Sequence, residues 1–242
     1  MLLGVEVWVV AVLAVALFVG SVVQGTVGLG LGLVGAPVAA LIAPELVPEV
    51  LLWLATLMAG QSLLIEHHGI DWRGLAFALP PRVVGTAVGV WVVATAPDDV
   101  IGLVVGLVVL VSVALTVRTV TLPVNRVTLP MAGFVSGVTG TATSIGGPPL
   151  AILYQHHDPR VLRPTLATYF VAGAAFSLVG LSLAGELQND HTLLALVLSP
   201  ILVLGLAVSV PVRRHLPRHV IRAGVLVVCA GSALVLVVRS LA

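Results

Sequence analysis

Residues 136–149 hold the groups best suited to chemistry: four glycines, two prolines and five hydroxyl side chains within 14 residues. A stretch of this composition would make a poor lipid-facing helix, so we expect its backbone to line a cavity inside the protein. A helix that restarts after Pro148 and Pro149 would offer free amides and the positive end of its dipole to an anion. The predicted ligands are Thr139, Thr141, Thr143, Ser144, Gly146 and Gly147.

Another glycine-rich stretch, the first along the chain, covers residues 24–37, with five glycines but only one hydroxyl, that of Thr26. Such a run either interrupts a helix in mid-membrane or lets two helices approach closely, and the sequence leaves both interpretations open. Under the first interpretation, this stretch contributes Gly25, Thr26 and Gly28 to the same site.

Two arginines could supply positive charge to that site. Arg82 follows Pro80 and Pro81, about eight residues into an apolar segment. A charge is costly to bury in a membrane, so Arg82 either pairs with an anion in the cavity or extends to the membrane surface. Arg163 begins a later apolar segment close to residues 136–149, and it is either a ligand or a cytoplasmic topology anchor.

The composition shows what must position these residues. The chain is 59% hydrophobic and 9% charged, with a mean hydropathy of +1.19, values typical of a protein surrounded by lipid rather than water. The basic residues are scattered, which argues against nucleic acid as a partner. We therefore expect an all-α polytopic membrane protein.

Ten apolar segments are long enough to mark as helices. The sixth and seventh are too short to cross as straight helices, and we expect them to be the arms of a broken or re-entrant hairpin whose tip is residues 137–149. The segments run approximately over residues 5–23, 27–43, 50–65, 75–96, 100–117, 127–139, 145–155, 161–184, 193–212 and 220–238.

The two halves of the chain repeat each other. An offset of 112 relates Gly25 to Gly137 and Pro37 to Pro149, and an offset of 120 later relates Pro80 to Pro200. Glycine and proline fix backbone geometry, so their matches carry more weight than matching valines and leucines. We expect repeats at residues 1–120 and 121–242, each a glycine-rich hairpin plus three transmembrane helices, together forming one transport domain.

Loop charges predict that the repeats are inverted. Glu45 and Glu49 follow the second segment, whereas Arg160 and Arg163 occupy the equivalent loop of the second half. Asp98 and Asp99 lie in the next loop compared, and its equivalent in the second half carries the arginines from Arg213 to Arg222. Because basic loops face the cytoplasm, equivalent loops lie on opposite sides. We expect an outer N-terminus and outer acidic loops, with Arg118 and Arg126 inside and Arg239 as the one discordant arginine.

Other chemistries have weaker support. The pairs His67–His68 and His156–His157 are either loop residues or parts of a proton relay, with Glu66 beside the first pair, and neither has metal-ligand spacing. No HExxH motif supports an intramembrane protease, and neither a Walker A motif nor any lysine supports ATP-driven transport. Cys229 is the only cysteine, so we expect it to serve packing.

The length, the duplicated hydrophobic architecture and the repeated G-x-x-G…G-x-P signature, at Gly25 to Pro37 and at Gly137 to Pro149, resemble the sulfite exporter TauE/SafE family, also called the toluene-sulfonate uptake permease group. The resemblance implies a multi-pass plasma-membrane protein that moves sulfite, a sulfonate or a related small anion by secondary transport. It implies no enzyme activity and no cofactor, and it leaves room for coupled protons and a homo-oligomer.

The first copy of the signature has Ala36 where the second has Pro148, so the halves are expected to contribute unequally. A small-anion channel remains the nearest alternative, and an intramembrane enzyme a more distant one.

Overall fold

The structure is a computed structural model that describes residues 3–27, 30–117, 122–215 and 218–241. Every regular element in these ranges is a helix, which confirms the expected all-α class. The elements are α1 (Val7–Val27), α2 (Leu31–Ile42), the 3-10 helix η1 (Pro44–Leu46), α3 (Glu49–Ile65), α4 (Trp72–Thr95), α5 (Asp98–Val117), α6 (Thr128–Thr143), α7 (Pro148–Tyr154), α8 (Pro159–Ala184), α9 (Asn189–His215) and α10 (Arg218–Leu241).

Four helices in the described ranges are long and apolar enough to cross a membrane: α1, α4, α8 and α9. Large apolar side chains such as Leu64, Leu183 and Val227 point outward and are more than two-thirds exposed. A soluble protein would rarely leave so much apolar surface in water, whereas lipid solvates it. The protein is therefore a multi-pass membrane protein.

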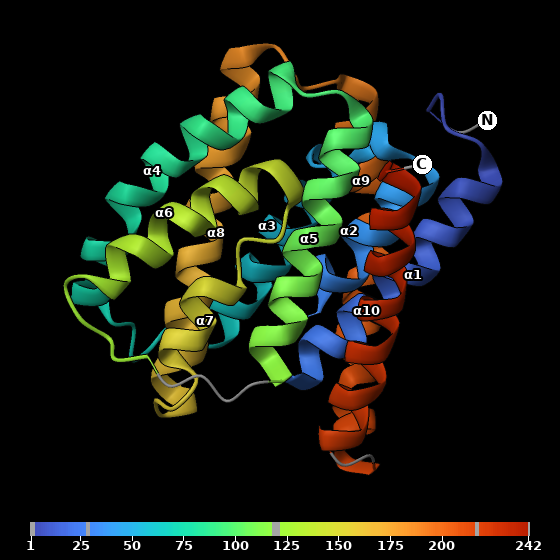
Figure 1. Ribbon diagram of the computed structural model, residues 1–242. Helices are drawn as coiled ribbons and strands as arrows, with labels where there is room; N and C mark the ends of the chain where they lie inside the picture. The colour runs from blue at the N-terminus through green and yellow to red at the C-terminus, as the bar shows by residue number, and fades with distance from the viewer. Residues whose placement is uncertain (1–2, 28–29, 118–121, 216–217, 242) are drawn as a thin grey trace.

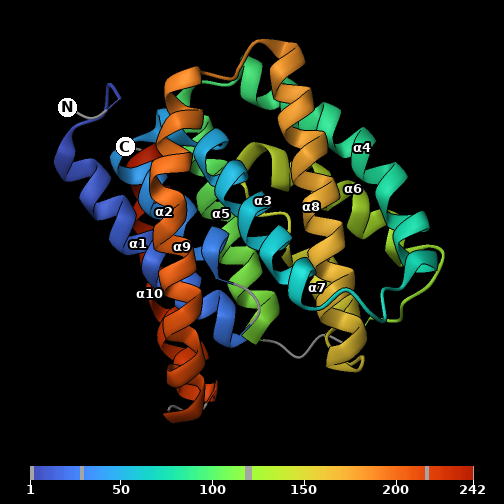
Figure 2. The same ribbon diagram turned by 180° about the vertical axis from the view of Figure 1, so that it is seen from behind.

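The helices form two groups that meet along α3 (Figures 1 and 2). One apolar core joins α1, α2, α3, α5, α9 and α10, and a second joins α4, α6, α7 and α8. A smaller cluster, in which Leu52 of α3 packs against Ala174 and Leu178 of α8, connects the two. This junction positions the candidate site.

Helices of the first half of the chain pack against helices of the second half. α4 packs against α6 and α1 against α9; likewise α4 packs against α8 and α3 against α9. A Cβ added at Gly137 would lie 2.8 Å from the backbone nitrogen of Thr86, and one added at Gly205 would lie 2.9 Å from the carbonyl oxygen of Phe18. Both glycines therefore let backbones of different halves touch, as small residues do in membrane helix interfaces.

Both glycine-rich stretches contain a helix break, but not where the sequence indicated. The second break spans only Ser144 to Gly147, so the first half of residues 137–149 continues α6 instead of forming the tip of a hairpin. Ser144 adopts a left-handed conformation, with φ 62° and ψ 9°, which ends α6. The last described residue of α1 is Val27, which the 112-residue offset relates to Thr139, whereas α6 ends at Thr143, about one helical turn further along.

Candidate functional site

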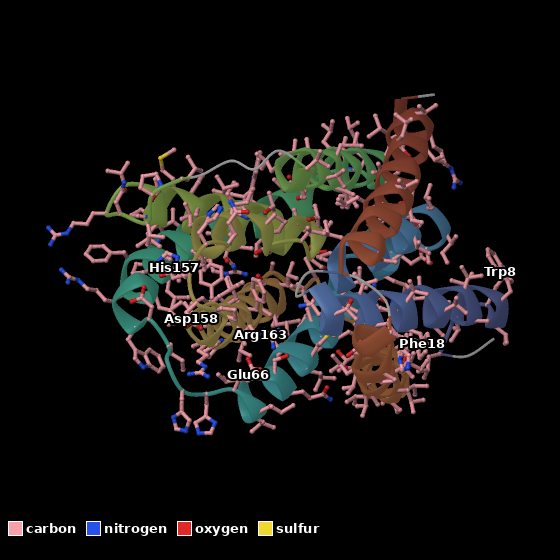
Figure 3. The ribbon with its side chains drawn as sticks, turned by 90° about the horizontal axis from the view of Figure 1, so that it is seen from below. Trp8, Phe18, Glu66, His157, Asp158 and Arg163 are labelled. Atoms are coloured by element: carbon pink, nitrogen blue, oxygen red, sulfur yellow. The ribbon has the colours of Figure 1, made fainter. Side chains whose placement is uncertain are left out.

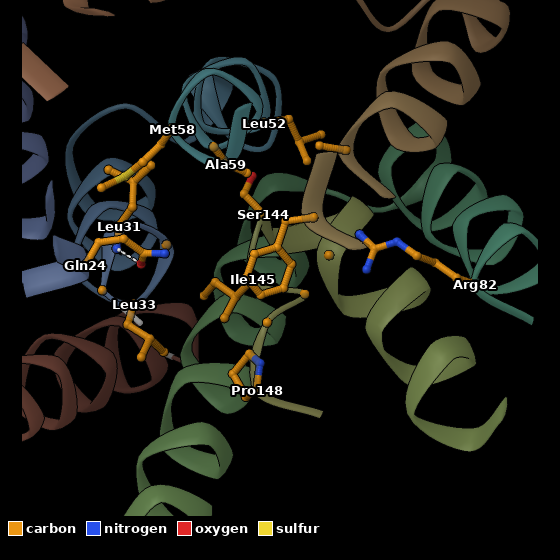
Figure 4. Close-up of a pocket in the computed structure, with 18 residues that line it drawn as sticks. Gln24, Leu31, Leu33, Leu52, Met58, Ala59, Arg82, Ser144, Ile145 and Pro148 are labelled. Atoms are coloured by element: carbon orange, nitrogen blue, oxygen red, sulfur yellow. Dashed lines mark hydrogen bonds between the residues drawn. The ribbon is translucent and has the colours of Figure 1, made fainter. Parts of the chain in front are cut away.

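A cavity lies where the two helix groups meet, beside the break between α6 and α7 (Figure 4). About 660 Å³ of it is free of atoms, part of which is open to the surroundings. Its polar groups come from Gln24, Arg82, Ser144 and the glycines around them, and apolar side chains form the rest. The complete lining is Gln24, Gly30, Leu31, Gly32, Leu33, Leu52, Ala55, Met58, Ala59, Arg82, Gly140, Ser144, Ile145, Gly146, Gly147, Pro148, Phe170 and Ala174.

Arg82 is the only charged residue in that lining, and it points inward rather than to the membrane surface. It is 3% exposed. Its Nη1 donates to the hydroxyl of Ser136 on α6 at 2.7 Å, and that hydroxyl in turn donates to the carbonyl of Gly146. Its Cζ lies 4.5 Å from the ring centroid of Tyr169 on α8, a cation–π contact. Three helices and the break therefore hold the guanidinium in place.

No carboxylate among the described residues neutralises the charge of Arg82. Among the described residues, the salt bridges join Arg163 to Glu66 and His191 to Glu49. The Nε of Arg82 and the hydroxyl of Tyr169 are buried without a hydrogen-bond partner. Buried polar groups are normally bonded, and an unpaired buried cation is strongly unfavourable. An anion in the cavity would supply the missing charge.

Two glycines make room for this arginine. A Cβ added at Gly140 would lie 3.2 Å from Nη2 of Arg82, and Gly173 on α8 contacts the guanidinium so closely that no Cβ fits there. Any larger side chain at position 173 would force Arg82 out of its place.

The break itself supplies the other predicted ligands that line the cavity: Ser144, Gly146 and Gly147. The Ser144 hydroxyl donates to the carbonyl of Pro48 at 2.8 Å, which ties the break to the start of α3. The expectation of free amides after the two prolines is corrected, because Pro148 and Pro149 are the first residues of α7 and carry no N–H.

The three predicted threonines lie on α6 outside the cavity lining, and each hydroxyl has a partner. Thr139 donates to the carbonyl of Val135 at 3.0 Å, and Thr143 to that of Thr139 at 2.7 Å. The Thr141 hydroxyl bonds that of Ser177 on α8 at 2.8 Å. The Thr141 hydroxyl therefore joins α6 to α8, whereas those of Thr139 and Thr143 bond carbonyls one turn earlier in α6. Their role as ligands remains a prediction.

Gly25 and Thr26, the described residues among those predicted from the first stretch, also lie outside the lining. Gly25 packs against Ser209 of α9, and the buried Thr26 hydroxyl donates to the carbonyl of Val23 at 2.9 Å. Gly28 falls outside the described residues, as does Arg118 among the topology markers. Of the two interpretations of this stretch, close helix packing applies to Gly25, which lies against α9.

Arg163 and the histidine pairs lie far from the cavity lining. Arg163 bonds Glu66 at 3.2 Å, with each side chain 43% exposed, at the end of the molecule shown in Figure 3. His67 and His68 are exposed, with ring centroids 4.1 Å apart. Within the described ranges, no three His, Cys or acidic residues gather as metal ligands. Cys229 is buried, as a packing residue would be.

A family model for the sulfite exporters TauE/SafE matches residues 12–236, nearly the whole chain. The chain belongs to the TauE/SafE family. It is therefore a membrane transporter of the sulfite-exporter type, as the repeated signature indicated. No curated protein and no solved structure matches the chain.

Sequence reasoning did not single out four residues of the site in this TauE/SafE protein: Gln24, Ser136, Tyr169 and Gly173. Gln24 lines the cavity, and its Oε1 accepts a 3.3 Å hydrogen bond from the amide of Leu31, across the first break. At the 112-residue offset Gln24 is equivalent to Ser136, so a polar residue in each repeat was a detectable signal. Nothing in the sequence related Tyr169 or Gly173 to Arg82.

Proposed function

We propose that this TauE/SafE protein is a secondary transporter, acting as an exporter, of a small anion such as sulfite or a sulfonate in the plasma membrane. The observation that carries the proposal is the buried guanidinium of Arg82, which lines a cavity at a broken helix and has no carboxylate partner among the described residues.

The geometry suits an anion with several oxygens. A guanidinium presents parallel N–H groups that match two oxygens of one anion. The amides of Gly146 and Gly147 lie in the same lining and would donate to the remaining oxygens, and the Ser144 hydroxyl would join them only by releasing the carbonyl of Pro48. The surrounding apolar side chains lower the local dielectric, which strengthens each charged hydrogen bond.

The two halves contribute unequally to this charge. At the 120-residue offset, Arg82 is equivalent to Leu202, which is fully buried in the first apolar core. One cation at the site favours a single small anion of low charge. Both glycine-rich stretches line the cavity, the first with Gln24 and residues 30–33 and the second with Gly140 and residues 144–148, so the two halves differ in the charge they supply rather than in lining the site.

We further propose that residues 1–120 and 121–242 are inverted repeats. The matched contacts support a two-fold repeat, because exchanging α1 with α6, α3 with α8 and α4 with α9 turns the α4–α6 contact into α1–α9 and the α4–α8 contact into α3–α9. The reversed charges of equivalent loops support its inverted orientation. Carriers of this kind bind at the repeat interface and expose the site alternately to each side. Proton coupling and a homo-oligomer belong to the same proposal.

Flux measurements in proteoliposomes test the transport class. Labelled sulfite, sulfoacetate and toluenesulfonate are supplied in turn, and the proposal predicts that at least one shows saturable uptake and counterflow. A channel would give uptake that does not saturate and no counterflow. Absence of flux for all three anions, with the protein correctly inserted, would overturn the proposal.

A further inference from the structure

A buried carboxylate and imidazole lie at the contact between α3 and α9. Glu49, the first residue of α3, has a side chain 4% exposed, and that of His191 on α9 is 9% exposed. Nδ1 of His191 lies 3.1 Å from Oε2 of Glu49. The carboxylate also accepts hydrogen bonds from the Thr192 hydroxyl at 3.1 Å and from the backbone amide of Gln188, whose nitrogen lies 3.1 and 3.3 Å from the two carboxylate oxygens. Every group around it stabilises a negative charge.

No arginine whose side chain the structure describes neutralises Glu49. The printed sequence has no lysine, and the described salt bridge of Glu49 is with His191 alone. Other charged side chains lie around this end of α3, and those that the structure describes are exposed and form no hydrogen bond or salt bridge with Glu49. They are Glu45, Asp99, Glu186, Asp190 and Arg239. The charge of the pair therefore depends on one proton, and imidazole exchanges protons near neutral pH.

The pair is connected to the cavity by two short links. Leu52, which lines the cavity, follows Glu49 by one turn of α3. The carbonyl of Pro48, the residue before Glu49, accepts the hydrogen bond from Ser144 at the break. Movement of the start of α3 would therefore reach both the cavity wall and the break beside Arg82.

The pair also joins the two halves of the chain, since α3 belongs to the first and α9 to the second. When His191 holds a proton, its positive charge pairs with Glu49 and stabilises the contact. When the proton leaves, a desolvated carboxylate remains with neutral donors only, which weakens the contact.

The opposite end of the molecule has a different junction. There the Tyr154 hydroxyl donates to Asp71 at 2.6 Å, and the Asp71 amide donates to the Thr165 hydroxyl at 2.9 Å, joining α7, α4 and α8. The nearby imidazole of His157, with its ring centroid 5.0 Å from that of Tyr154, is exposed rather than buried against the carboxylate. The buried acid–imidazole pair is confined to the α3–α9 contact among the described residues.

We propose that Glu49 and His191 form the proton-binding site that couples anion transport to a pH gradient. The inference rests on the proposed function. Under the proposed orientation, the pair lies at the outer, acidic end, where Glu45 is also found. A proton from the outer solution would bind between Nδ1 of His191 and the Glu49 carboxylate, and its release would accompany each transport cycle.

Two assays in proteoliposomes separate the coupling site from the transport function. Counterflow of labelled sulfite at equal pH on both sides measures the carrier alone, and sulfite flux driven by an imposed pH gradient measures coupling. Glu49→Gln, and separately His191→Asn, which keeps an amide nitrogen near the position of Nδ1, should retain counterflow and reduce gradient-driven flux at least tenfold. Asp190→Asn, an exposed neighbour on α9, is the matched control and should change neither rate.

Each result has a definite meaning. Gradient-driven flux that stays at the wild-type level in both Glu49→Gln and His191→Asn would overturn the coupling site while leaving the proposed function intact. Wild-type protein that shows no counterflow of sulfite would overturn the assignment of sulfite and the coupling role together. Retained counterflow in either variant also shows that the variant is folded.

Discussion

Gly173 on α8 lies directly against the guanidinium of Arg82 on α4, with no space for a Cβ between them. Gly173→Ala should therefore displace Arg82 and reduce anion counterflow at least tenfold, although alanine favours the helix by about 1 kcal/mol over glycine. The measurement is counterflow per inserted protein, with thermal unfolding to confirm the fold.

The matched control for this glycine is Gly231→Ala on α10. Gly231 has open space where a Cβ would stand, so this substitution should leave counterflow unchanged. Equal counterflow in Gly173→Ala and wild type would show that the position of Arg82 is not needed for transport.

Tyr154 and Asp71 predict an acid-sensitive stability. Burial raises the pKa of Asp71, but the hydrogen bonds from Tyr154 and from the backbone amide of Gly74, together with the nearby His157, outweigh it and hold the pKa below the ordinary value of an aspartate. A depressed folded-state pKa gives stability that is present above the unfolded value and is lost as the pH falls through the folded value. The contribution is therefore complete at pH 7, begins to fall below the unfolded carboxyl value of about 4, and is lost as the pH falls through the lower folded pKa.

Tyr154→Phe should lower stability at pH 7 by about 1.5–3 kcal/mol, the typical value of a hydrogen bond to a charged group, and by less at pH 3. Unfolding in detergent at the two pH values measures the difference. In an Asp71→Asn background, the same substitution should cost less at pH 7 and lose its acid dependence. A cost for Tyr154→Phe that is the same at both pH values would contradict this account of the pair.

Inverted repeats predict opposite sides for equivalent loops. In a Cys229→Ala background, cysteines introduced at Glu45 and Asp98 should react with an impermeant thiol reagent from outside, and those at Arg160 and Arg213 only after the membrane is opened. Glu45 and Arg160 are exposed, so both positions are open to the reagent. Labelling of Asp98→Cys and Arg213→Cys from the same side would exclude the inverted arrangement.

Hydropathy was sufficient to find the helices, because burial in lipid requires long apolar runs whatever their partners. The break was harder to place. Gly137 appeared to interrupt a helix, yet it packs against the α4 backbone inside α6, while Gly146 and Gly147 lie in the break itself. A glycine serves either purpose, and only the position of a neighbouring helix decides between them.

Charged residues show the same limit. The sequence left Arg82 between the cavity and the membrane surface, and contacts with Ser136 and Tyr169, 54 and 87 residues away, place it at the cavity. Glu49 was expected to be a loop charge like Glu45, but His191 and the groups beside it allow its burial. Such partners are distant in sequence, so no local pattern reveals them.

Counterflow of labelled sulfite by Arg82→Gln tests most directly whether the buried guanidinium binds the transported anion. Hydrogen bonds to a charged ligand contribute about 1.5–3 kcal/mol each, so their loss should weaken binding and slow counterflow at subsaturating sulfite by roughly tenfold or more. The counterflow rate of Arg82→Lys should lie between those of wild type and Arg82→Gln, because lysine keeps the charge but lacks the planar guanidinium. Arg73→Gln, an exposed arginine at the start of the same helix, is the matched control and should transport like wild type. Wild-type counterflow by a correctly inserted Arg82→Gln would contradict the central claim and place the anion site elsewhere.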